Sequence, residues 1–224
     1  PRPASAGAGL DGTGSGEPAA QIGRTRRTLA VRWNSTATDE DDVMRLPRFF
    51  APAPESEAAR RLYLRLVEQA RQPAFYRDRQ VPDSLDGRFE MMALHGFLLL
   101  HRFKAEGEAG RRLAQALFDT IFADLDGQVR ELGVGDLGVG KRIKAMARAF
   151  YGRIQAYGDG LSQPETLEQA LARNLYGTTV ASPETLAAMA RYLRREAARL
   201  AEVPFASLGQ GEVAFGPPGL ADSP

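Results

Sequence analysis

Apolar side chains recur every three or four residues through most of the chain, which is the spacing of one face of an α-helix. This spacing predicts helices over residues 56–71, 84–104, 111–132, 141–157, 164–176 and 182–203. No segment shows the two-residue alternation of a half-buried strand. The pattern therefore predicts an all-α fold, an antiparallel helical bundle of about six or seven helices.

One predicted helix, residues 84–104, is apolar on almost every face, with Phe89, Phe97 and Phe103 pointing in different directions. A helix of this kind is buried on all sides, so we expect it at the centre of the bundle. Either Asp83 or Ser84 is a good N-cap for it.

The pattern divides the chain into four parts. Residues 1–43 hold few large apolar side chains and many Pro, Gly, Ala and Ser, so we expect a disordered tail. Its arginines suit a transit peptide, but the acidic run 39–42 favours a dispensable tail upstream of a start at Met44. We expect a linker over residues 44–56, a helical domain over 57–203 and a loose tail over 204–224.

Composition excludes several functions. Lys and Arg number 29 against 28 Asp and Glu, a formal charge of +1, whereas a DNA-binding protein usually has a basic excess. With no cysteine, disulfides, iron–sulfur clusters and thiol catalysis are excluded. No apolar run reaches the roughly 18 residues that span a bilayer, and no signal peptide is evident, so we expect a soluble cytoplasmic protein.

A glycine-rich stretch matches two nucleotide-binding patterns. Gly133, Gly135 and Gly138 form G-x-G-x-x-G, while Gly135, Gly140 and Lys141 form G-x-x-x-x-G-K. Both motifs require a preceding strand, and a helix is predicted there instead. Arg142 also stands where a phosphate loop needs Ser or Thr for magnesium. We therefore favour a flexible link between helices over residues 133–140.

Metal, haem and acid–base sites find little support. His95 and His101, the only two histidines, are six residues apart and point about 240° apart on a helix, so a shared metal site is disfavoured. Asp119 and Asp126 share a helix face, but a solvated face paired with Arg130 explains them better. We predict no cofactor, no metal and no enzyme activity.

Arginines, acids and aromatic side chains cluster in several blocks, which is typical of protein interfaces but also of helix caps and surface ion pairs. As candidates for binding a client or partner protein we select Arg71, Phe75, Tyr76, Asp83, Arg88, Glu90, His95, Arg130, Glu131, Asp136, Lys141, Lys144, Phe150, Tyr151 and Arg153.

These blocks resemble, in order, the motifs of the ubiquinol–cytochrome c chaperone family. The matching segments are Val67–Tyr76, Val81–Glu90, Leu94–His95, Leu117–Asp119, Arg130–Asp136, Lys141 with Lys144, Ala149–Arg153 and Ala156–Tyr157. The resemblance runs from about residue 58 to about residue 200 and thins after Leu161. Gly138 and Gly140 depart from the Ser and Pro common in the family, which leads us to expect a looser start of the following helix.

The resemblance implies a non-enzymatic assembly factor of the bacterial type. Its client would be newly made or unassembled cytochrome b, bound during membrane insertion or haem acquisition, and DNA would not be a partner. A ribosome, a small partner protein and peripheral contact with the inner membrane are further implied partners; a eukaryotic chain would instead lie in the mitochondrial matrix.

Two other interpretations stay open at this point. One is a nucleotide-binding enzyme that uses the glycine loop Gly133–Lys141. The other is a peripheral membrane or haem-handling protein.

Overall fold

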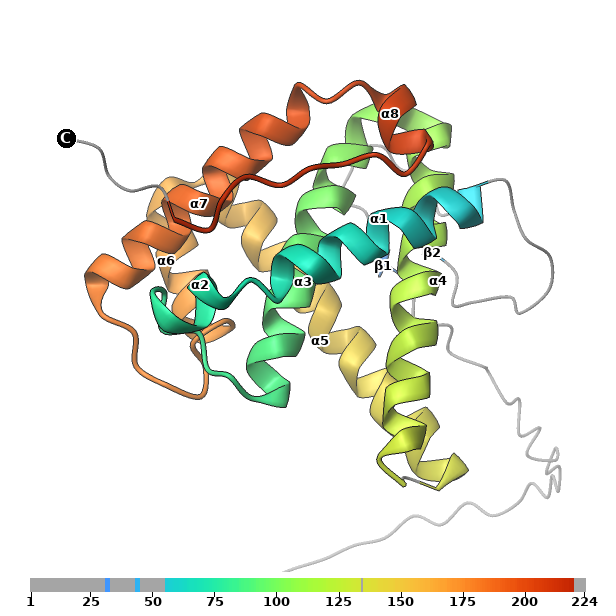
Figure 1. The fold of residues 1–224 in the computed structure, drawn as a ribbon, viewed down its shortest axis with the longest axis horizontal. Coiled ribbons are helices and arrows are strands. Elements are labelled where there is room, and N and C mark those ends of the chain that lie inside the picture. The colour runs from blue at the N-terminus through green and yellow to red at the C-terminus, as the bar shows by residue number, and fades with distance from the viewer. Residues whose placement is uncertain (1–30, 33–42, 45–54, 134, 220–224) are drawn as a thin grey trace, which may run out of the picture.

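A computed structural model describes residues 31–32, 43–44, 55–133 and 135–219 (Figure 1). Its long helices are α1 (Glu55–Ala70), α3 (Leu85–Phe103), α4 (Gly107–Glu131), α5 (Asp136–Ser162), α6 (Pro164–Arg173) and α7 (Pro183–Ala201). Its short helices are α2 (Pro73–Arg77), α8 (Phe205–Gly209) and the 3₁₀ helix η1 (Lys104–Glu106). The described residues also hold a two-residue antiparallel pairing of β1 (Val31–Arg32) with β2 (Val43–Met44). The predicted all-α bundle is confirmed.

Local sequence signals explain where several helices begin. The hydroxyl of Ser84 accepts a hydrogen bond from the Gly87 amide at 3.1 Å, and Ser182 caps α7 in the same way through Thr185. Both serines satisfy an amide that the first helical turn leaves unpaired. Proline in the first turn of α2, α6 and α7 loses no helical hydrogen bond, because that position has no partner.

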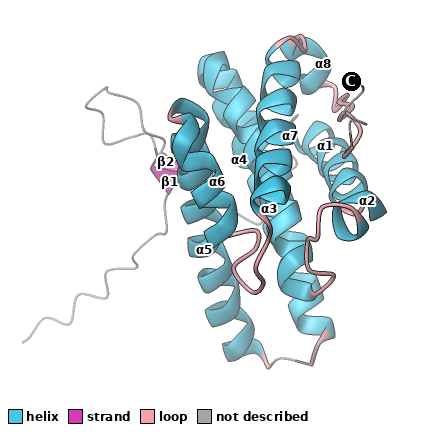
Figure 2. Ribbon diagram, turned by 90° about the vertical axis from the view of Figure 1, so that its left-hand side faces the viewer, coloured by secondary structure: helices cyan, strands magenta, loops and turns pink. Residues whose placement is uncertain are grey.

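Helix α3 is the centre of the bundle, as its composition predicts. Every residue from Glu90 to Leu100 is buried, and the helix contacts α1, α4, α5 and α7. Figure 1 shows α1 crossing α3 while α4 and α5 lie beside them. On one side Phe118, Phe122 and Phe150 pack ring against ring, with centroids 4.4–5.9 Å apart. The view turned by 90° shows α7 on the other flank of α3 (Figure 2).

The start of α5 differs from the prediction of a flexible link. The helix begins at Asp136, so residues 136–140 form its first turn, and the Gly138 and Val139 amides bond to the Gly135 carbonyl. Val139 is fully buried. Burial of that side chain offsets the helix cost of Gly138 and Gly140, which is about 1 kcal/mol each.

The C-terminal segment also differs from the loose tail that we expected. After α8 the chain returns along α1 toward α7 (Figure 1). Gly216 accepts a hydrogen bond from the Gln69 side chain at 2.7 Å and donates one to Glu196 at 2.8 Å. The Phe215 ring meets the buried His95 ring edge-on, at 5.2 Å between centroids. The predicted disordered tail over 1–43 lies outside the described residues except for 31–32 and 43.

Two glycines of α5 provide a matched test of the packing of α5 against α6. A Cβ on Gly160 would lie 2.8 Å from the backbone of Leu167, whereas a Cβ on Gly152 would meet no atom within 4 Å. We expect Gly160→Ala to lower the free energy of unfolding by about 1–3 kcal/mol and Gly152→Ala to raise it by about 0.5–1 kcal/mol. Urea denaturation measures both; changes of the same sign would contradict this packing.

Candidate functional site

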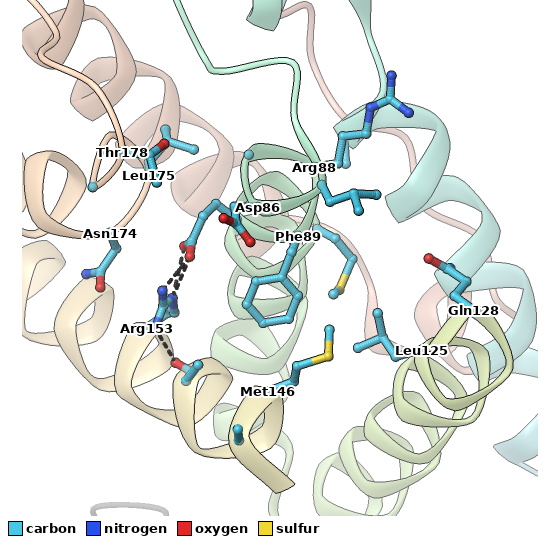
Figure 3. Close-up of a pocket in the computed structure, with 18 of the residues that line it drawn as sticks. Asp86, Arg88, Phe89, Leu125, Gln128, Met146, Arg153, Asn174, Leu175 and Thr178 are labelled. Atoms are coloured by element: carbon cyan, nitrogen blue, oxygen red, sulfur yellow. Dashed lines mark hydrogen bonds and ion pairs between the residues drawn. The ribbon is translucent and has the colours of Figure 1, made fainter. Parts of the chain in front are cut away.

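A groove of about 630 Å³ opens beside the first turns of α3. Its walls come from α1, α3, the C-terminal half of α4, residues 142–153 of α5, the last residue of α6 and the chain that follows it to residue 178 (Figure 3). These elements are far apart in the sequence, so the groove exists only in the folded chain.

The floor of the groove is apolar. Phe89 and Met92 reach it from α3, Leu125 and Val129 from α4, and Met146 from α5. In Figure 3 the side chains of Phe89, Leu125 and Met146 face the same space. Methionine is flexible and polarisable, so it adapts its shape to different contacts.

A buried ion pair lies at one end of this floor. The Arg153 Nε on α5 donates to both carboxylate oxygens of Glu90 on α3, at 3.0 and 2.9 Å, and Nη2 also contacts Glu90. Nη1 donates to the Ala149 carbonyl at 3.1 Å. Burial raises the pKa of the Glu90 carboxyl, and the hydrogen bonds from Arg153 offset part of that rise. The pair joins the central helix to α5.

Further arginines surround the opening. Arg71, Arg142 and Arg173 are exposed and line the groove, and no salt bridge joins any of them to another described residue. Arg88 also lines it, and its guanidinium lies 2.9 Å from Asp83, with both side chains exposed. The edge of the groove therefore carries positive charge.

The groove brings together four of the predicted interface residues, Arg71, Arg88, Glu90 and Arg153. Three others lie in the core, where no partner could touch them: Phe75, His95 and Phe150 are each 0% exposed. Composition does not separate these cases, because interface centres and protein cores use the same aromatic side chains.

The remaining candidates lie outside the groove. Tyr76 donates to the Ala70 carbonyl at 2.8 Å, and Arg130 pairs with Asp126 at 2.5 Å on α4. The Tyr151 ring stacks on Phe118 and its buried hydroxyl has no partner among the described residues. The other exposed candidates outside the groove are Asp83, Glu131, Lys141 and Lys144. Asp136 begins α5, and its side chain lies outside the described residues.

Several groove residues had no signal in the sequence pattern. Gln128 and Met146 read as ordinary positions on amphipathic helices, and Arg173 lies at the end of α6, outside the blocks. Leu132 looked like the end of a helical stripe, yet its side chain is 59% exposed and lines the groove. Only the packing of α4 against α5 and α6 against α5 brings these residues together.

Neither the glycine motif nor the histidines form a chemical site. The glycine patterns start in the link after α4 and continue into the first turn of α5, where the Gly138 and Val139 amides already bond to the Gly135 carbonyl. Within residues 55–133 and 135–219 no group of three or more His, Asp or Glu could hold a metal ion. No helix in the described part of the chain is long and apolar enough to cross a membrane.

His95 is instead a structural residue of the core. Its Nδ1 lies 2.8 Å from the Met91 carbonyl and its Nε2 lies 2.8 Å from the Tyr192 hydroxyl. Gln69 donates to the same hydroxyl at 3.0 Å, so the network joins α1, α3 and α7. Full burial lowers the pKa of His95 to about 4, so the ring is neutral near pH 7.

Comparison with known proteins supports one family. The model of the ubiquinol–cytochrome c chaperone family matches residues 77–215. The ubiquinol–cytochrome-c reductase complex assembly factor 1 of Xenopus laevis is 28% identical over 62% of this chain and 70% of its own length. The human protein of that name is 29% identical over 62% of this chain, and the match spans only 47% of the human protein.

Yeast and bacterial relatives extend the comparison. The mitochondrial protein CBP3 of Saccharomyces cerevisiae is 27% identical over 65% of this chain and 45% of its own length. The crystal structure of the Cbp3 homolog from Brucella abortus is 39% identical, with a TM-score of 0.66. That similarity covers 74% of this chain and 92% of the Brucella chain.

The buried ion pair gives a prediction about stability. Arg153→Ala leaves the Glu90 carboxylate, which is 8% exposed, without its partner, so we expect a loss of about 3 kcal/mol in the free energy of unfolding. The control is Arg88→Ala, whose exposed pair with Asp83 contributes below about 1 kcal/mol. Replacing both partners, as Glu90→Leu with Arg153→Met, is expected to cost less than Arg153→Ala alone. Equal losses for Arg153→Ala and Arg88→Ala in urea denaturation would refute this role.

His95 gives a prediction about pH. Its pKa rises from about 4 in the folded chain to about 6.5 in the unfolded one, so the unfolded chain binds more protons between these values. The contribution of neutral His95 to the free energy of unfolding is complete above pH 6.5 and falls by about 3 kcal/mol as the pH drops to 4. Asp119, whose pKa burial raises to about 6, acts in the opposite direction.

Because Asp119 is present in both proteins, the difference between wild type and His95→Gln isolates the histidine. We expect the wild type to lose more stability than His95→Gln between pH 7 and pH 5, measured by urea denaturation at each pH. Parallel pH profiles for the two proteins would show that His95 is not buried in its neutral form.

Proposed function

The chain belongs to the ubiquinol–cytochrome c chaperone family, and we propose that it is a non-enzymatic assembly chaperone of ubiquinol–cytochrome c reductase that binds newly made cytochrome b. The printed names of the vertebrate relatives support the assembly role. The region matched by the family model, residues 77–215, includes α3 to α7, which supply most of the groove.

The groove is the observation that carries the binding role. It gathers arginines and apolar side chains from five separate elements around one concave surface. Glu90 and Arg153 neutralise each other's charge, so this ion pair supports the structure of the groove and leaves ligand contacts to the other arginines. An apolar centre with an arginine-rich edge is the usual composition of a protein interface.

The first test is a strain that lacks the gene for this chain. We expect the reduced-minus-oxidised spectrum of its membranes to lose the cytochrome b signal of ubiquinol–cytochrome c reductase, while cytochromes of other complexes keep theirs. A plasmid copy of the gene should restore the signal. Normal levels of the assembled complex in the deletion strain would contradict the proposal.

A second measurement addresses cytochrome b directly. A tagged chain is purified from cells in which another subunit of the complex has been deleted, so that unassembled cytochrome b accumulates. We expect cytochrome b, identified by mass spectrometry, to co-purify in excess over the other subunits. Co-purification of the subunits in equal amounts would indicate binding to the finished complex instead.

A further inference from the structure

We propose that the groove binds an amphipathic helix of a protein partner, with apolar side chains on the floor and Asp or Glu side chains at the arginine edge. This inference rests on the proposed function, since it specifies what kind of segment the chaperone holds.

Exposed apolar side chains adjoin the floor of the groove. Four large apolar side chains are exposed in the described residues, and two of them, Leu85 at 68% and Leu132 at 59%, line this groove. They continue the floor formed by Phe89, Leu125 and Met146 toward solvent. Exposed apolar side chains that adjoin an apolar concave surface enlarge one continuous apolar patch, and such a patch is a feature of binding sites.

The charged side chains of the groove are mostly basic. Arg71, Arg142 and Arg173 line the groove without a salt bridge to any described residue. The acidic lining residues are Asp86 and Glu90, and Glu90 is already occupied by Arg153. Guanidinium groups form strong, often two-pronged hydrogen bonds with carboxylates, so they favour an acidic ligand.

Helix α5 adds to this charge. From Leu137 to Gly158 it carries no acidic residue, while Lys141, Arg142, Lys144 and Arg148 are all basic and exposed. Arg142 lines the groove, and the other three lie outside it on the same half of α5, so this helix brings positive charge to that side of the groove. A basic ligand would be repelled there, which gives selectivity as well as affinity.

The volume of the groove suits a short stretch of helix. A groove of about 630 Å³ has room for the three or four inward-facing side chains that two turns of an amphipathic helix present. Recognition of this kind uses apolar anchors spaced three or four residues apart, with polar contacts at the edge. Apolar floor and charged edge thus fit the two faces of one helix.

The direct test uses two fluorescently labelled peptides of about 16 residues each, a length that forms about four helical turns. Both consist of Leu, Ala and one charged residue type, with the same apolar stripe; the charged residues are Glu in one peptide and Lys in the other. By fluorescence anisotropy we expect the Glu peptide to bind at least about tenfold more tightly, since several edge contacts change sign. Equal binding of the two peptides, or binding of neither, would overturn the inference.

Matched variants locate the binding site. Arg142→Glu should weaken binding of the Glu peptide about two- to fivefold, the range of an exposed ion pair, whereas Arg148→Glu on the same helix lies outside the groove and should not. Leu132→Ser should weaken binding, whereas Leu64→Ser, at a leucine that is 53% exposed on another surface, should not. Equal effects within either pair would place the peptide elsewhere. All four positions are exposed, so we expect the variants to fold, and circular dichroism checks this.

Two further measurements separate this inference from its rivals. Flotation with vesicles of 70% phosphatidylcholine and 30% phosphatidylglycerol tests whether the ligand is a lipid surface. If the protein binds these vesicles but neither peptide, and if both Arg142→Glu and Arg148→Glu abolish vesicle binding, the ligand is an anionic membrane surface and not a helix. In the deletion strain, Arg142→Glu with Arg173→Glu should restore less cytochrome b than Arg148→Glu does. If the deletion lowers cytochrome b but both variants restore it fully, the groove inference fails while the assembly role stands.

Discussion

The burial of α3 on all sides is the constraint on which the rest of the structure depends. Because every residue from Glu90 to Leu100 is buried, α1, α4, α5 and α7 must surround this helix. The two ionisable residues of that stretch then need partners inside the protein. Glu90 finds Arg153 on α5, and His95 finds Tyr192 on α7. The polar contacts thus select which helix lies on which side, while the apolar contacts supply most of the stability.

The same constraint explains the position of the groove. At the first turns of α3 the pattern changes, since Leu85, Asp86 and Arg88 are exposed while Gly87 and Glu90 are buried. The bundle is therefore open here on the side where α4 ends and α5 begins. Arg153 ties α5 to α3 just beneath this opening. This ion pair consequently attaches the floor to the bundle, beneath an edge of exposed side chains.

The sequence predicted what local pattern determines and missed what distant contacts determine. The central helix and the Ser84 and Ser182 caps were predictable, because their causes lie within a few residues. The first turn of α5 was not predictable, because its glycines disfavour a helix locally and the burial of Val139, which stabilises the helix, depends on distant contacts. Nor was the attachment of Gly216 to Gln69, 147 residues away. For the site, the Arg-rich blocks pointed to Arg71, Arg88 and Arg153, but gave no sign of Arg173.

Stability and binding use different residues in this fold, and that separation has a consequence for the groove. The core surrounds α3, whereas Leu132, Arg142 and Arg173 contribute exposed side chains at the edge of the groove. No salt bridge joins either arginine to a described residue. Substitutions at these edge positions can therefore change a partner's affinity without unfolding the bundle. Glu90 and Arg153 are different, because they line the groove and also join α3 to α5. An effect of Arg153 on partner binding is accordingly coupled to stability, and the exposed edge is where recognition can be measured independently.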